Sequence, residues 1–336
     1  MEIRDVLTRG ITLIVDPQSL KISSDEFLAN YGGYIENLIV VAKSTSGRVF
    51  YPSKIAPADE EFPTFFSELV GAAADIGIKV GAYVNVFADA FFAADPEYKT
   101  YTSDGRTLDA IVCPNKPNFQ QHMVKVIKEI AQYPIKSLFL ANLGYANESF
   151  CYCSDCRTGF SEYAELLHDF QAVDFSSDPS LVQRWIGWRK ELMSNAIKDF
   201  ISSAQEDERN IHVFPTIPID PEREYSVGTE SHLGLDIQTI SKASQHLALE
   251  VFPWSYVLPD PGSKEFSDYV AGLSFLEGLR ESEIELVMTH WVLEDEDEFS
   301  RAKALADKVE IGKIYSMLDY PVDYQTLREI RLGLTH

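Results

Sequence analysis

The sequence predicts an α/β fold of the (β/α)₈ barrel type. Short apolar, β-branched runs recur along the chain and alternate with longer segments whose apolar residues have helical spacing. The runs are hydrophobic almost throughout, which is typical of parallel strands covered on both faces. Eight such runs separated by helical segments match the strand number of a (β/α)₈ barrel. A doubly wound open sheet is the alternative.

The candidate strands are spaced widely enough for a helix between neighbours. They cover residues 11–15, 38–42, 79–86, 137–142, 212–216, 247–251, 285–289 and 313–318. The segments with helical spacing include residues 62–76, 118–132, 181–204 and 265–280. Asp16 and Pro17 follow the first strand, where a dinucleotide-binding loop needs spaced glycines, and this disfavours a Rossmann-type open sheet. We therefore expect a single barrel domain over residues 1–336.

The composition is that of a globular protein with a large acidic excess. The chain has 336 residues, of which 45% are hydrophobic, and 29 Lys and Arg against 52 Asp and Glu give a formal net charge of −23. Such a charge repels phosphate backbones and anionic lipids, and no basic patch offsets it. No apolar run approaches the roughly 20 residues of a membrane span, and the first residues lack the apolar core of a signal peptide. We expect a cytoplasmic protein without nucleic-acid or membrane partners. The sequence is compatible with a homo-oligomer.

The cysteines are concentrated in one part of the chain. Cys151, Cys153 and Cys156 form a C-x-C-x-x-C motif, and Cys113 is the other cysteine. Four thiolates complete a closed tetrahedral zinc site, which contributes folding energy rather than catalysis. A redox-active C-x-x-C and four ordinary reduced thiols are the alternatives. We expect a structural Zn²⁺ that clamps a loop at about residues 112–163.

Polar and aromatic residues follow the candidate strands. In a (β/α)₈ barrel the chemistry lies at the carboxyl ends of the strands. Carboxylates, amides and flat aromatic faces together suit a hydroxyl-rich ring with an apolar C–H face. Each of these side chains could instead satisfy loop backbone or pack in the core. The predicted substrate-binding residues for a carbohydrate are Asp16, Asn85, Asn142, Tyr145, Trp254, His290 and Trp291.

Two stretches around the cysteines carry a resemblance to known enzymes. Residues 150–163, FCYCSDCRTGFSEY, resemble glycoside hydrolase family 42 and related hypothetical glycosyl hydrolases. Residues 112–119, VCPNKPNF, are similar to the V-C-P-N-x-P-x-F pattern before the fourth strand of the broader glycosidase-like group. The resemblance covers about a sixth of the 336 residues. It implies a TIM-barrel glycosidase and assigns a structural zinc to Cys113, Cys151, Cys153 and Cys156, followed by a helix that contains Phe160.

The same resemblance implies a retaining mechanism with two carboxylates about 5 Å apart, an acid/base after strand four and a nucleophile near strand seven. At the first position the family has Asn-Glu, whereas this chain has Asn142-Leu143, and a leucine cannot transfer a proton. Glu148, in the same loop, is one substitute for the missing acid. Glu250 begins an E-x-x-P run like the one around the family's nucleophile, although it ends the sixth candidate strand. Its apolar, aromatic neighbours predict a raised pKa for its carboxyl group.

Three hypotheses about function follow. In the first, the protein is a glycoside hydrolase whose catalytic residues are Glu250 and Glu148. In the second, it is a barrel that binds a carbohydrate or related ligand without hydrolysis, because the acid/base of the family is missing. In the third, Asp16, Glu250 or His290 supports another reaction. The separation of the carboxyl groups at the barrel's carboxyl face distinguishes the first hypothesis from the second.

Overall fold

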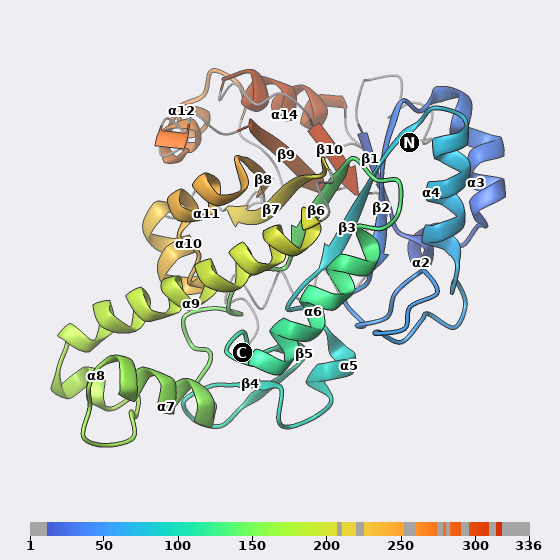
Figure 1. Cartoon of the computed structure of the whole chain (residues 1–336). Helices are drawn as coiled ribbons and strands as arrows, with labels where there is room; N and C mark the ends of the chain where they lie inside the picture. Colours follow the sequence, from blue (N-terminus) through green and yellow to red (C-terminus); the bar gives the residue numbers. More distant parts are fainter. Residues whose placement is uncertain are drawn as a thin grey trace.

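The structure is a computed structural model that describes residues 12–206, 210–219, 225–251, 260–273, 278–279, 283–289, 296–308 and 314–317. Within these residues the parallel strands close into a barrel in the order β1-β10-β9-β8-β7-β6-β3-β2 (Figure 1). The strands are β1 (Thr12–Val15), β2 (Asn37–Lys43), β3 (Lys79–Asn85), β6 (Ser137–Ala141), β7 (His212–Ile219), β8 (His246–Val251), β9 (Glu283–Thr289) and β10 (Ile314–Met317). Because β1 pairs with both β2 and β10, the barrel prediction is confirmed and the open sheet is excluded.

The described helices lie around the barrel and, in part, to one side of it, as Figure 1 shows. They are α2 (Pro17–Leu20), α3 (Ser24–Tyr31), α4 (Phe65–Asp75), α5 (Ala90–Ala93), α6 (Pro117–Ile130), α7 (Ser154–Tyr163), α8 (Asp174–Ser177), α9 (Ser180–Ala204), α10 (Tyr225–Leu233), α11 (Ile237–Ser244), α12 (Lys264–Gly272) and α14 (Glu296–Lys308), with the 3₁₀ turn η1 (Gly32–Tyr34). None of the described helices is long and apolar enough to cross a bilayer.

The sequence explains where the predicted helices begin and end. Pro117 starts α6, where its missing N–H is not needed, and the buried residues Phe119, Met123, Ile127 and Ile130 recur at helical spacing on its inner face. The predicted segments 62–76 and 118–132 agree with α4 and α6 to within a few residues, and 181–204 agrees with α9. The described helix α12 is shorter than the predicted segment 265–280, because it ends at Gly272.

An antiparallel hairpin between β3 and α6 was not predicted. It consists of β4 (Lys99–Tyr101) and β5 (Thr107–Val112). Both strands are short and partly exposed, so they lack the continuous apolar run of the barrel strands. The tight connection contains Asp104 and Gly105, and Gly105 adopts a φ of 86° that favours glycine. The hairpin matters for the site because β5 leads directly into Cys113.

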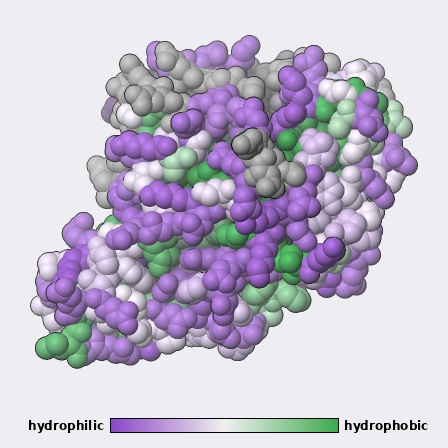
Figure 2. Space-filling view, in the orientation of Figure 1, coloured by the Kyte–Doolittle hydropathy of each residue, from purple (hydrophilic) through white to green (hydrophobic). Residues whose placement is uncertain are grey.

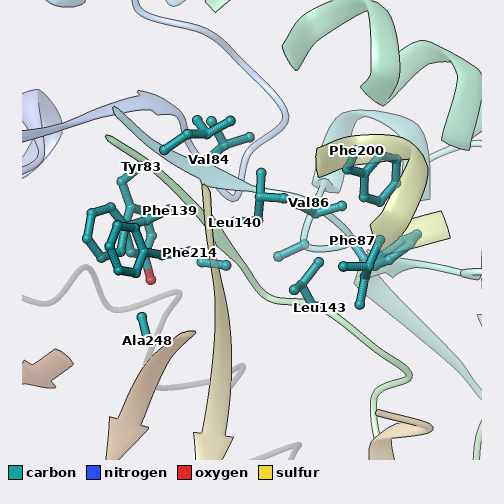
Figure 3. Close-up of a cluster of buried hydrophobic side chains, with 14 of the residues drawn as sticks. Tyr83, Val84, Val86, Phe87, Phe139, Leu140, Leu143, Phe200, Phe214 and Ala248 are labelled. Carbon is teal, nitrogen blue, oxygen red and sulfur yellow. The ribbon is translucent and has the colours of Figure 1, made fainter. Parts of the chain in front are cut away.

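The barrel interior is filled by stacked aromatic rings. Phe139 and Phe214 lie parallel with their centroids 4.8 Å apart, and Tyr315 lies 5.0 Å from Phe139. Figure 3 shows Tyr83 and Ala248 on the same side of the strands as these rings. Because successive side chains of a strand point to opposite faces, residues two positions further along also point inward. The next inward-facing positions towards the carboxyl ends of β3 and β8 are Asn85 and Glu250.

The face of the molecule shown in Figure 2 is mostly hydrophilic, as expected for a formal net charge of −23. Exposed apolar side chains are scattered rather than continuous on the described residues. Four of the exposed large apolar residues lie in or next to α7, α8 and the start of α9, namely Tyr163, Leu167, Val173 and Val182.

Candidate functional site at the carboxyl end of the barrel

Asp16 follows β1 and is a buried acid at the carboxyl end of the barrel. Its side chain is only 1% exposed. Asp16 Oδ1 accepts a hydrogen bond of 2.9 Å from the backbone N–H of Gln18 and so caps α2. Asp16 Oδ2 is buried without a hydrogen-bond partner among the described residues. Burial raises the pKa of Asp16 from 3.8 to about 6, the Gln18 hydrogen bond opposes this rise, and the charge of Asp59 adds to it.

Asp16 is therefore expected to lower the stability of the protein above pH 6. Below pH 3.8 the carboxyl is protonated in both the folded and the unfolded chain, and between 3.8 and about 6 the unfolded chain ionises first. The Asp16→Asn variant keeps the capping oxygen and removes the charge. We expect it to match the wild type near pH 3.5 and to exceed its free energy of unfolding by about 3 kcal/mol above pH 6, as measured by urea denaturation. If the difference in free energy of unfolding between Asp16→Asn and the wild type stayed constant across these pH values, the raised pKa of Asp16 would be contradicted.

A buried ion pair joins the last residue of β2 to the loop after β3. Lys43 Nζ lies 2.9 Å from Asp89 Oδ2, and both side chains are fully buried. Lys43 Nζ also donates to the backbone carbonyl of Asn85 at 2.9 Å. Asp89 accepts from the backbone N–H of Phe92 and caps α5. Gly47 lies against Asp89 with a φ of 84°, and an added Cβ would be 2.2 Å from Asp89 Oδ1, so this position requires glycine.

The two predicted amide residues are brought together beside this pair. Asn142 Nδ2 donates to Asn85 Oδ1 at 2.6 Å, and Asn85 Nδ2 donates to the carbonyl of Lys43 at 2.9 Å. Both asparagine side chains are buried, Asn85 fully and Asn142 with 7% exposed. The amides thus connect the carboxyl ends of β2, β3 and β6 into one polar layer. Asp89 is the member of this layer that sequence analysis missed, because it lies in a loop four residues beyond β3.

Glu250 lies near the carboxyl end of β8, the sixth barrel strand in chain order, as predicted. It pairs in register with Pro218 of β7 and Val287 of β9 and is 5% exposed. It shares the inward face of β8 with Ala248, so its carboxyl belongs to the same end of the barrel as Asp16 and Lys43.

The other predicted site residues have different surroundings. The Glu148 side chain is 60% exposed, with Oε2 lying 3.4 Å from His232 Nδ1. Tyr145 is fully buried, and the guanidinium of Arg189 lies over its ring at 4.1 Å. Burial raises the pKa of the Tyr145 hydroxyl. A substrate contact of Tyr145 therefore stays a prediction, and Trp254, His290 and Trp291 lie outside the described residues.

The four cysteines converge into one buried cluster. Cys113 follows β5, while Cys153 precedes the first residue of α7 and Cys156 lies in its first turn. Cys113 Sγ is 3.6 Å from Cys153 Sγ and 3.4 Å from Cys156 Sγ, and all four sulfurs lie within 4.8 Å of one another. These separations are too long for a disulfide and close to the roughly 3.8 Å between two sulfurs on tetrahedral zinc with Zn–S of about 2.3 Å. The four cysteines could therefore hold a metal ion.

The surroundings of the sulfurs also suit a metal site. The backbone N–H of Tyr101 points at Cys151 Sγ at 3.3 Å, and that of Cys153 at 3.5 Å. Burial raises the pKa of the Cys113 thiol, and a divalent cation supplies the charge that lets buried thiols ionise. Lys116, paired with Asp155, adds a positive charge close to the cluster.

Comparison with known proteins identifies the fold. No protein-family model matches the chain, and no curated protein matches it significantly. The PgaB (BpsB) glycoside hydrolase domain from Bordetella bronchiseptica is similar with a TM-score of 0.67 and 14% identity, covering 96% of this chain and 97% of that chain. The barrel has the fold of the TIM-barrel glycoside hydrolases.

Two further solved structures support this statement. The α-L-fucosidase isoenzyme 2 from Paenibacillus thiaminolyticus has a TM-score of 0.63 and 15% identity, covering 96% of this chain and 49% of that chain. Gan42B, a GH42 β-galactosidase from G. stearothermophilus, has a TM-score of 0.61 and 11% identity, covering 96% of this chain and 56% of that chain. This chain thus spans about half the length of each of these two enzymes. At these identities the likeness shows the fold.

Proposed function

We propose that this protein is a glycoside hydrolase that acts on a carbohydrate at the carboxyl end of the barrel. The observation that supports this most is the placement of two buried carboxyl groups, Asp16 and Glu250, at the same end of a glycoside-hydrolase-type barrel. Lys43, Asn85 and Asn142 add a cation and two amides to that end, which are groups that hydrogen-bond sugar hydroxyls.

Hydrolysis of a glycosidic bond needs one carboxyl group that is protonated and one that is ionised. We propose Glu250 as the ionised carboxylate. For the acid there are two candidates. Asp16, with a pKa of about 6, is partly protonated near neutral pH and has an oxygen without a partner among the described residues. Glu148 is exposed and paired with His232, so it would have to turn inward to serve.

The cysteine cluster has a structural role in this proposal. The four sulfurs would hold Zn²⁺ as a closed Cys₄ site with no open position, so the ion would contribute to stability rather than to bond cleavage. The site would fasten the hairpin of β4 and β5 to the start of α7. The cysteine spacing and this geometry together support a relationship to the GH42-like enzymes.

Glu250→Gln tests the catalytic role. Because glutamine keeps the size but can neither attack nor exchange a proton, we expect the rate of aryl-glycoside hydrolysis to fall at least a thousandfold with unchanged folding. Asp16→Asn and Glu148→Gln, measured on the same substrates, identify the acid: only the variant that lacks it should lose the alkaline limb of the pH–rate profile. Glu97→Gln, an exposed position, is the control. Equal rates for Glu250→Gln and the control would refute the role of Glu250.

A further inference from the structure

A second group of metal-binding side chains lies at the opposite, amino end of the barrel. His212, His246 and Glu283 are the first residues of β7, β8 and β9, respectively. His212 Nδ1 is 2.9 Å from His246 Nε2, and His246 Nδ1 is 3.2 Å from Glu283 Oε2. Donor atoms of the three residues lie within 4.8 Å of one another. The two imidazoles thus face each other with ring nitrogens, and a carboxylate holds the far side of one ring.

We infer that these residues form a binding site for a divalent transition-metal ion of the Zn²⁺ class. Imidazole nitrogens and a carboxylate are ligands that zinc and its neighbours prefer. Two nitrogens on a tetrahedral zinc at about 2.0–2.1 Å lie about 3.3 Å apart, so a small rotation of the rings from their 2.9 Å separation admits the ion. Glu283 Oε2 lies 3.2 Å from His246 Nδ1, so its negative charge lies beside the imidazoles and favours a bound cation.

The backbone fixes the positions of these side chains. His246 pairs in register with Glu283 across β8 and β9, and His212 pairs with Ser137 of β6. The ring of His246 also packs on Phe214, with centroids 4.9 Å apart. The rings are therefore held on adjacent strands of a closed barrel. Folding already orders them, so binding an ion loses little further conformational entropy.

The site is accessible to ions and water. His212 is exposed, and the Glu283 side chain is 52% exposed. His212 and Glu283 line a cavity of about 180 Å³ at the amino ends of the strands, which leaves space for water molecules as the remaining ligands. Lys79 and Lys136 also line the cavity and oppose a cation, whereas the carboxylates of Glu283 and Glu285 favour it.

An ion at this place would act on stability rather than on hydrolysis. It would join the starts of three consecutive barrel strands, at the face of the barrel that lies opposite the chemistry. Because a metal that binds the folded chain stabilises it by mass action, added Zn²⁺ should raise the unfolding temperature through this site. The inference does not depend on the proposed glycosidase activity.

The test compares the number of zinc ions bound by the wild type with the number bound by His212→Ala. We expect isothermal titration with Zn²⁺ to detect one more site per chain in the wild type than in His212→Ala, whatever the cysteines bind. Because His212 is exposed, this variant should fold normally. His168→Ala is the matched control, since His168 is also exposed and lies 3.0 Å from a carboxylate of Asp174.

Two further results complete the test. Glu283→Gln should weaken the second site at least tenfold, and crystals soaked in Zn²⁺ should show an anomalous peak between His212 and His246. The inference is overturned if the wild type and His212→Ala bind the same number of zinc ions with the same affinity, or if His168→Ala loses the same site.

Discussion

Cys153→Ser is expected to abolish metal binding at the cysteine cluster and to lower the free energy of unfolding by about 4 kcal/mol or more. With one thiolate replaced by a hydroxyl, three sulfurs leave the tetrahedral set incomplete, and the remaining buried thiols lose the cation that favours their ionised forms. The hairpin of β4 and β5 would no longer be fastened to α7. Metal analysis and thermal unfolding of purified protein measure both effects.

The neighbouring serine gives a matched control for this prediction. Ser154 is exposed in the first turn of α7 and contributes no sulfur, so Ser154→Ala should keep the zinc of the cysteine cluster and nearly the stability of the wild type. Wild-type protein that contains no metal, with all four thiols reacting freely in the folded state, would disprove the zinc site. Equal stability of Cys153→Ser and Ser154→Ala would disprove the structural role of the zinc site.

Lys43→Met is expected to lower the free energy of unfolding by about 3–5 kcal/mol, because it leaves the carboxylate of Asp89 buried and without its cation. The double variant Lys43→Met/Asp89→Asn removes the charge but keeps the acceptor that caps α5. We expect it to recover most of the loss, which would show as a coupling energy of at least about 2 kcal/mol in a double-mutant cycle. Urea denaturation of the wild type, the two single variants and the double variant gives the four free energies of unfolding in the cycle.

An exposed lysine shows what burial contributes. Lys128 forms an ion pair of 2.8 Å with Glu206, and the two side chains are 40% and 58% exposed. Lys128→Met should change the stability by at most about 1 kcal/mol. If Lys43→Met cost no more than Lys128→Met, the buried pair would not organise the carboxyl end of the barrel.

The strands β2 and β3 were predictable because each is buried on both faces. Residues 38–42 are a continuous apolar run, and residues 79–86 are interrupted only by Lys79, Gly81 and Asn85. The strands β2 and β3 occupy these positions with buried side chains over most of their length. The hairpin of β4 and β5 was missed because its strands are short and partly exposed, although Asp104-Gly105 is a turn signal. The local sequence thus predicted the strands whose side chains are buried along most of their length.

The site was predictable only in part. The positions of Asp16, Asn85 and Glu250 at the carboxyl ends of strands could be predicted from the apolar runs before them, and Cys113 could be grouped with the C-x-C-x-x-C motif by its chemistry. The contact of Lys43 with Asp89 depends on how the loop after β3 packs against the end of β2, and no spacing in the sequence indicates it. The facing rings of His212 and His246 are likewise a consequence of barrel closure, since they begin neighbouring strands 34 residues apart.

The location of a bound sugar tests the central proposal most directly. We would determine crystal structures of the inactive Glu250→Gln variant soaked with a panel of oligosaccharides. The proposal predicts a sugar at the carboxyl end of the barrel, within hydrogen-bond distance of residue 250 and of Asp16 Oδ2. A sugar bound only elsewhere, or no sugar from the panel at that end, would contradict it.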